Sequence, residues 1–188
     1  KKQLLESIKN QKTNPGLTAS KAFSNVMYGN SVLGRYYTGT YQSVDKIKLE
    51  DVKRYYSENY VPNLSNLVVV GELGEAEMNE KLKFFAEWEK KDTKLPEITS
   101  FPKYEGPQIL LIDKPGAAQS EIRIGFMAHK FDYNDVYFKS NLMNFPLGGN
   151  FSSRISLNLR EDKGFTYGAR SYFRGNDYVG PYEASAAV

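Results

Sequence analysis

The sequence predicts an α+β fold in which helices are layered on small sheets in two domains. Apolar residues at helical spacing dominate residues 1–90, and residues 108–188 combine strand-like alternation with further helical segments. Residues 91–107 between them contain three prolines and show no sustained periodicity, which is typical of a linker. Both ends of the sequence fall inside an expected element. We therefore expect two incomplete domains, 1–90 and 108–188, joined by the linker 91–107.

The composition is that of a globular chain. Its 188 residues are 40% hydrophobic and 25% charged, with a formal net charge of +3. Basic and acidic residues are interleaved, so no nucleic-acid footprint is expected. No apolar run approaches the roughly 18 residues needed to span a bilayer. The absence of cysteine excludes disulfides and thiolate metal sites.

Two helices are expected to meet at Asn14-Pro15. The residue before a proline avoids the helical region, and proline itself suits the first helical position. The second helix ends at Gly29 and has an apolar stripe at helical spacing, made of Ala19, Ala22, Phe23, Val26 and Met27.

The rest of the first domain alternates helix and strand signals. A helical region is expected over 44–59 and another over 75–88, where Glu75 and Glu77 suit the first turn. The β-branched run 67–70 between them predicts a short strand covered on both faces.

The second domain is expected to open with a β-hairpin. Residues 108–113 and 119–127 have strand character and flank the turn Lys114-Pro115-Gly116. Within the second of these strands, alternation places three apolar side chains on a common face, namely Ile122, Ile124 and Phe126.

A helix is expected over 134–145, ended by Pro146 and followed by a turn at Gly148-Gly149. The next helix ends at Gly164, a position that suits a left-handed residue. Extended chain is expected over 165–173, with Tyr167, Ala169 and Ser171 on one face, and residues 182–188 alternate as a strand.

Arg160 and Tyr167 lie seven residues apart across a helix end, a glycine and the next strand. Arginine offers a fixed fork of donors that keep their charge, and a tyrosine hydroxyl can donate to a carbonyl oxygen or to a developing oxyanion. The pair therefore suits a grip on a peptide backbone. The alternative is structural: Arg160 satisfies the last carbonyls of its helix and Tyr167 is half-buried in a sheet.

Four segments in order resemble the insulinase/pitrilysin family of zinc metallopeptidases, which includes the mitochondrial processing peptidases. They are Leu4 to Pro15, Met27-Tyr28-Gly29, Asp51 to Leu73 and Leu147 to Tyr167. The resemblance covers nearly the whole chain. It implies two-layer α/β sandwich domains of the metallohydrolase type, with the end of a first peptidase-like domain followed by the start of a second.

In that family a His-x-x-Glu-His motif and a later glutamate hold the zinc. The motif is absent from this sequence, and the resemblance places the later glutamate ligand at Ser7. A neutral hydroxyl is a poor zinc ligand, which implies that no cofactor is bound here and that zinc lies in a partner half. A shift of one residue would instead make Glu6 the ligand of an active half. The single histidine, His129, is expected in a loop.

The resemblance implies the non-catalytic half of a zinc metalloendopeptidase. Its expected partners are a catalytic peptidase half and extended peptide substrates, which Arg160 and Tyr167 would hold. Gly148 and Gly149 stand where processing-peptidase relatives carry a glycine-rich loop over the substrate. A tight turn with positive dihedrals is the alternative for the two glycines. The alternative for the whole chain is a structural or assembly subunit without peptide binding.

Overall fold

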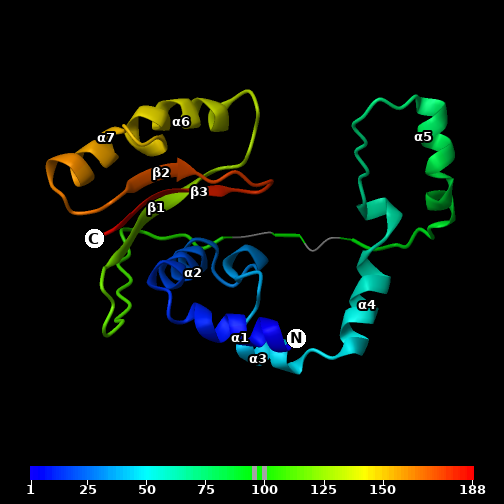
Figure 1. The fold of residues 1–188 in the computed structure, drawn as a ribbon, viewed down its shortest axis with the longest axis horizontal. Helices are drawn as coiled ribbons and strands as arrows, with labels where there is room; N and C mark the ends of the chain where they lie inside the picture. Colours follow the sequence, from blue (N-terminus) through cyan, green and yellow to red (C-terminus); the bar gives the residue numbers. More distant parts are fainter. Residues whose placement is uncertain (95–96, 99–100) are drawn as a thin grey trace. The chain divides into compact units, whose positions relative to one another are not determined.

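The computed structural model describes residues 1–94, 97–98 and 101–188. The chain divides into two compact units, which are considered separately (Figure 1). Unit 1 consists of Lys1–Tyr41 and Ile98–Val188, and unit 2 of Gln42–Glu97. The expected linker 91–107 includes residues 95, 96, 99 and 100, which lie outside the described residues. The division into domains 1–90 and 108–188 stays a prediction.

Unit 1 begins with helices α1 (Lys2–Gln11) and α2 (Pro15–Tyr28). The expected junction at Asn14-Pro15 is confirmed. The Asn14 side chain accepts a hydrogen bond of 2.9 Å from the backbone N–H of Leu17, which caps α2. Gly29 follows the helix with a φ of 58°, in the region that favours glycine. A short 3₁₀ turn, η1 (Val32–Gly34), comes next.

An antiparallel three-stranded sheet forms the centre of unit 1. Its strands are β1 (Glu121–His129), β2 (Ala169–Phe173) and β3 (Gly180–Ala187), in the spatial order β1-β3-β2. Figure 1 shows α2 on one side of the sheet and α6 and α7 on the other. The predicted mixed α/β class is therefore confirmed, with β3 as the central strand.

The predicted hairpin of 108–113 with 119–127 is wrong. Residues 108–113 form no strand, and β1 pairs with β3 instead, with Glu121 opposite Ala187. Sequence alternation shows which residues share a face but not which strand lies alongside. Ile122, Ile124 and Phe126 do share one face of β1, as predicted. Their exposed fractions show that this face is not covered.

Two helices of unit 1 contain wide π-helical turns. Helix α6 (Val136–Asn144) continues into η4 (Phe145–Gly149), and α7 (Arg154–Ser156) continues into η5 (Leu157–Asp162). The prediction that Pro146 ends its helix is therefore wrong. Proline lacks a donor N–H, and it stands at the start of the π-helical turn, where the hydrogen-bond register changes.

Unit 2 is built from α3 (Tyr41–Lys46), whose first residue belongs to unit 1, and α4 (Leu49–Asn59), α5 (Glu75–Lys81) and two 3₁₀ turns. The turns are η2 (Pro62–Leu64) and η3 (Lys83–Glu87). The predicted helical regions are confirmed, each as two shorter pieces. The predicted buried strand over 67–70 is wrong, because this run has no partner strand in the described part of unit 2 and Val70 is 92% exposed.

The core of unit 1 joins α2 to the sheet. Phe23, Met27 and Tyr28 are buried together, and Met127 of β1 packs against them. Gly125 of β1 is essential to this contact, because a Cβ there would lie 2.6 Å from the Phe23 ring. The Tyr28 hydroxyl also donates to the Val179 carbonyl at 3.1 Å. Residues more than a hundred positions apart thus fix α2 against the sheet.

Candidate functional site

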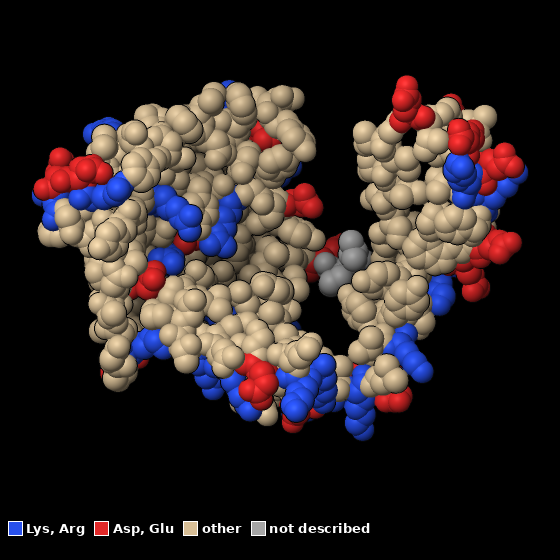
Figure 2. Space-filling model, in the orientation of Figure 1, with Lys and Arg blue, Asp and Glu red and all other residues tan. Residues whose placement is uncertain are grey.

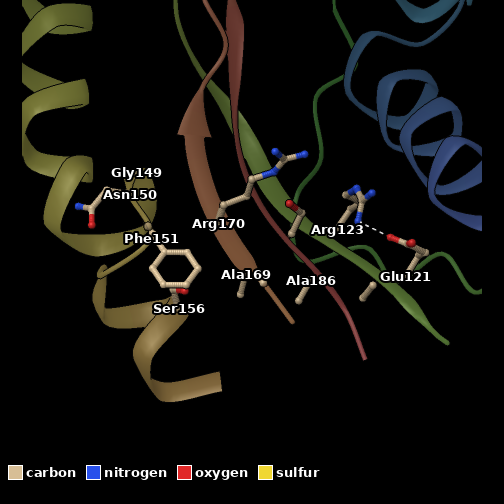
Figure 3. Close-up of a pocket in the computed structure, with 13 residues that line it drawn as sticks. Glu121, Arg123, Gly149, Asn150, Phe151, Ser156, Ala169, Arg170 and Ala186 are labelled. Atoms are coloured by element: carbon tan, nitrogen blue, oxygen red, sulfur yellow. Dashed lines mark hydrogen bonds and ion pairs between the residues drawn. The ribbon is translucent and has the colours of Figure 1, made fainter. Parts of the chain in front are cut away.

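The two predicted glycines border an open cavity of about 520 Å³ in unit 1 (Figure 3). The cavity lies beside the start of β2, the end of β3 and the start of β1, with the loop after η4 as its other wall. The residues that line it are Glu121, Arg123, Gly148, Gly149, Asn150, Phe151, Ser156, Gly168, Ala169, Arg170, Ser185, Ala186 and Ala187.

Gly148 is required by packing and not by a turn. A Cβ at this position would overlap Ser171 of β2, lying 2.6 Å from its backbone nitrogen. Neither Gly148 nor Gly149 has a positive φ, so the predicted tight turn with positive dihedrals is wrong. Instead, the absence of a side chain lets η4 lie directly on β2, which brings the backbone of this loop to the edge of the cavity.

A buried pair of polar side chains holds η4 on β2. The Ser171 hydroxyl donates to Asn144 Oδ1 at 2.6 Å, and Asn144 Nδ2 donates to the Ser171 carbonyl at 2.7 Å. Both side chains are almost completely buried, and these bonds satisfy the Ser171 hydroxyl and both polar atoms of the Asn144 amide. The wall beside Gly148 is therefore rigidly supported.

A row of polar side chains crosses the sheet on the face opposite Ser171, and its members also line the cavity. Ser185 of β3 lies opposite Arg123 of β1 and opposite Arg170 of β2. Because directly opposed residues of antiparallel strands point to the same face, the two guanidinium groups flank the serine. Figure 3 shows Arg123 and Arg170 extending to the same side of the sheet, and Figure 2 shows basic and acidic side chains close together on the face of unit 1 that is turned to the viewer.

Arg123 is fixed by two carboxylates. Its Nη1 lies 3.0 Å from Glu121 Oε2, and its Nε lies 3.2 Å from Glu183 Oε1. The Glu183 side chain is only 1% exposed, and its other oxygen lies 2.6 Å from Arg174 Nη2. A buried carboxylate of this kind needs both cations to compensate for the water it has lost.

Tyr172 completes this network beside the cavity. Its hydroxyl accepts a hydrogen bond of 3.1 Å from Arg174. Burial raises the pKa of the Tyr172 hydroxyl, and the nearby Arg174 charge offsets part of that effect. The phenol therefore stays neutral at physiological pH and acts as an acceptor for Arg174.

Arg160 lies in η5, outside the lining of the cavity, and contacts it through Phe151. The Arg160 guanidinium is stacked 4.2 Å from the centroid of the Phe151 ring, which itself lines the cavity. Its Nη1 is 3.5 Å from Glu161 and is buried without a hydrogen-bond partner among the described residues. The side chain thus has donor capacity left over.

The end of η5 is capped by backbone groups and not by the Arg160 side chain. Gly164 has a φ of 63°, as predicted, and its N–H donates to the Arg160 carbonyl at 3.1 Å. The N–H of Phe165 donates to the Leu159 carbonyl at 2.9 Å. The structural alternative, in which the Arg160 guanidinium satisfies these carbonyls, is therefore wrong.

Tyr167 is 92% exposed in the bend before β2. The prediction that it shares a face with Ala169 and Ser171 is wrong, because both of those side chains are buried under the helices. The strand begins only at Ala169, since Thr166 bonds to both the N–H and the carbonyl of Gly168 and bends the chain. The Tyr167 hydroxyl consequently faces solvent.

The predicted ligand positions on α1 are both exposed. Ser7 is exposed, and Glu6 pairs with Lys9 at 3.2 Å, which raises the pKa of Lys9. Among residues 1–94, 97–98 and 101–188, no group of three or more His, Cys, Asp or Glu side chains is placed to hold a metal. The described residues therefore do not supply a zinc ligand set.

His129 is the last residue of β1, so its predicted loop position is wrong. Its ring stacks on Phe173 with centroids 5.2 Å apart, and its Nε2 is buried without a hydrogen-bond partner in the described part of the chain. This packing gives the histidine a structural place in unit 1.

Sequence reasoning missed Arg123, Arg170 and Ser185. Alternation along β2 does place Arg170 on the face opposite Ser171, and that was the available signal. The row itself depends on the register of β3 with both neighbouring strands, which no local sequence pattern contains.

Within the helices that the structure describes, none has the length and apolarity to cross a membrane.

The model of the peptidase M16 inactive domain matches residues 46–186. The match covers most of the chain, which therefore belongs to this family. The predicted membership of the insulinase class is thus confirmed at the level of an M16 inactive-type domain.

Two curated relatives illustrate the range of proteins that share this domain. The chain is 27% identical over 172 residues to the uncharacterized zinc protease YmxG of Bacillus subtilis (strain 168), covering 92% of this chain and 41% of the relative. It is 26% identical over 183 residues to the non-peptidase homolog YmxG of Helicobacter pylori (strain ATCC 700392 / 26695), covering 94% and 40%. The chain thus spans less than half of the length of these relatives.

Solved structures share the fold. The peptidase M16 inactive domain from Pseudomonas fluorescens has a TM-score of 0.81 at 24% identity, covering 100% of this chain and 45% of that one. A protease from Helicobacter pylori has a TM-score of 0.86 at 20% identity, covering 99% and 46%. At these identities the similarity establishes architecture and not activity.

Proposed function

We propose that this chain is part of the non-catalytic half of an M16-type zinc peptidase and holds extended peptides for a zinc site on the partner half. The observation that carries the proposal is the match to the M16 inactive domain over residues 46–186. The open cavity beside β2 supports it, because its wall from Gly149 to Phe151 and its row of donors offer a surface for a peptide.

We assign to Arg160 and Tyr167 the role of donating hydrogen bonds to carbonyl oxygens of the bound peptide. The Arg160 guanidinium is stacked on the Phe151 ring at the cavity wall, and its side chain is 32% exposed. Tyr167 offers a solvent-facing hydroxyl just before β2. Bond cleavage is assigned to the partner half, where zinc would be held.

The test uses the whole protein together with its catalytic partner half. Arg160→Ala and Tyr167→Phe are each expected to lower peptide hydrolysis about tenfold, since each removes about one hydrogen bond to the peptide. Zinc content should not change. Arg154→Gln and Tyr133→Phe alter exposed residues that do not line the cavity and serve as matched controls.

Unaltered turnover in both test variants would reject the assigned roles. Glu6→Gln belongs in the same series, because it addresses the alternative of an active half. Loss of stoichiometric zinc in Glu6→Gln would establish Glu6 as a ligand and replace the proposal.

A structural or assembly role without peptide binding is the second candidate. It is favoured by one observation, the description of the Helicobacter pylori relative as a non-peptidase homolog. Titration of an unstructured peptide against the intact inactive half separates the two functions. Saturable binding that is weakened by Arg160→Ala supports peptide holding, and the absence of binding supports the structural role.

A further inference from the structure

The cavity has an uncompensated positive charge at Arg170. Each of the other buried or half-buried charges on this face of the sheet has a partner: Arg123 contacts Glu121 and Glu183, and Glu183 also contacts Arg174. Arg170 is exposed at the cavity and forms no ion pair or hydrogen bond with any residue in the described ranges. The face therefore carries two carboxylates and three guanidinium groups.

The groups beside Arg170 are donors as well. Ser185 lies directly between Arg170 and Arg123 in the strand register, and all three line the cavity. Carboxylates hold Arg123 in place from one side, which fixes its guanidinium against the sheet. Neighbouring donors of this kind, mounted on strands, form a pre-organised site for an anion.

We infer that Arg170, Ser185 and Arg123 form a subsite for a carboxylate of the bound peptide, so that this cavity favours acidic peptides. The inference rests on the proposed peptide-holding function. A planar carboxylate accepts two parallel hydrogen bonds from a guanidinium, and a serine hydroxyl can donate to the same group. The carboxylate can belong to an Asp or Glu side chain or to the C-terminus of the peptide, and both sources have the same chemistry.

Peptide binding to the whole protein tests the subsite. A fluorescent extended peptide has either Glu or Gln at one position and a C-terminus that is either free or amidated, and all four combinations are compared. The Glu position is moved along the peptide in separate experiments. The wild-type protein should bind the best acidic form about fivefold more tightly than its neutral counterpart, and this preference should shrink at high salt.

Variants assign the preference to Arg170. Arg170→Gln should abolish the preference, because it weakens binding of the acidic peptide more than binding of the neutral one, and Arg170→Glu should reverse the preference in favour of a Lys-containing peptide. Arg154→Gln, an exposed arginine outside the cavity, should leave the preference intact. Urea unfolding of each variant verifies that the fold is retained.

The outcomes separate this inference from the function on which it rests. A preference that depends on Glu assigns the subsite to an acidic side chain, and one that depends on the free terminus assigns it to the peptide's end. Equal binding of acidic and neutral peptides would overturn the subsite and leave peptide holding intact. A protein that binds neither peptide would overturn the proposed function itself.

Discussion

Two apolar stretches have strand character, and the one in unit 1 forms a strand whereas residues 67–70 of unit 2 do not. In unit 1 the alternating residues of β1 pair along their length with β3, although the partner lies about sixty residues further on. Among the described residues of unit 2 the run 67–70 has no such partner, and Val68 and Val70 are largely exposed. The comparison teaches that a strand here depends on long-range pairing more than on its own β propensity.

Among the predicted losses of stability, the largest is expected for Glu183→Ala in unit 1. The change leaves Arg123 and Arg174 facing each other without their shared buried carboxylate. It should lower the free energy of unfolding of unit 1 by about 3 kcal/mol, as measured by urea unfolding and by hydrogen exchange of the β3 amides. Glu105→Ala, at an exposed glutamate, should have little effect, and a loss under about 1 kcal/mol in Glu183→Ala would contradict the prediction.

Gly148→Ala tests how far the stability of unit 1 depends on the packing of η4 against β2. The added Cβ overlaps Ser171 and forces η4 away from β2, which should cost about 2 kcal/mol in unfolding free energy. Gly168→Ala is the matched control, because a Cβ there meets no atom within 4 Å among the described residues. Equal stabilities of the two variants would refute the close approach of η4 to β2.

Asp132 gives unit 1 a smaller, pH-dependent contribution. It accepts hydrogen bonds from the backbone N–H groups of Tyr137 and Asp135 at the start of α6, and these bonds hold the pKa of its carboxyl below the ordinary 3.8. A lowered folded pKa means stability that is present above the unfolded pKa and lost as the pH falls through the folded pKa. Asp132→Asn should flatten the decline of stability below about pH 4, and an unchanged pH profile would argue against this role.

The smallest effect is expected from Val68→Thr in unit 2. An exposed valine without a strand partner loses little on gaining a hydroxyl, so the unfolding free energy should change by less than about 0.5 kcal/mol. Val61→Thr makes the same chemical change at a buried position of the same unit and should cost about 1 kcal/mol or more. If Val68→Thr proves as costly as Val61→Thr, residues 67–70 must be buried against a partner.

Local signals were sufficient to predict the helical regions and some of their ends. Asn14, Gly29 and Gly164 act through their own backbone conformation or through bonds to residues a few positions away. The π-helical turn η4 was not predicted, because its Gly148 packs on Ser171 of a distant strand, and no local signal marked η5. The partner of β1 was predicted wrongly for the same reason.

The candidate site was only partly accessible from the sequence. Family resemblance pointed to Arg160, Tyr167, Gly148 and Gly149, and the structure places the two glycines at a cavity. The reason for Gly148 lies in Ser171, more than twenty residues away. No local motif marks Arg170, and its place in the polar row follows only from the register of the three strands.

The position of β3 at the centre of the sheet has a consequence for biosynthesis. The two outer strands do not pair with each other, and both precede β3 along the chain. A ribosome therefore releases β1 and β2 before their common partner exists, and neither can complete a ladder until Gly180–Ala187 has emerged. The nascent chain must carry the unpaired backbone groups of β1 through that interval, a stage at which chaperone binding would protect it from self-association.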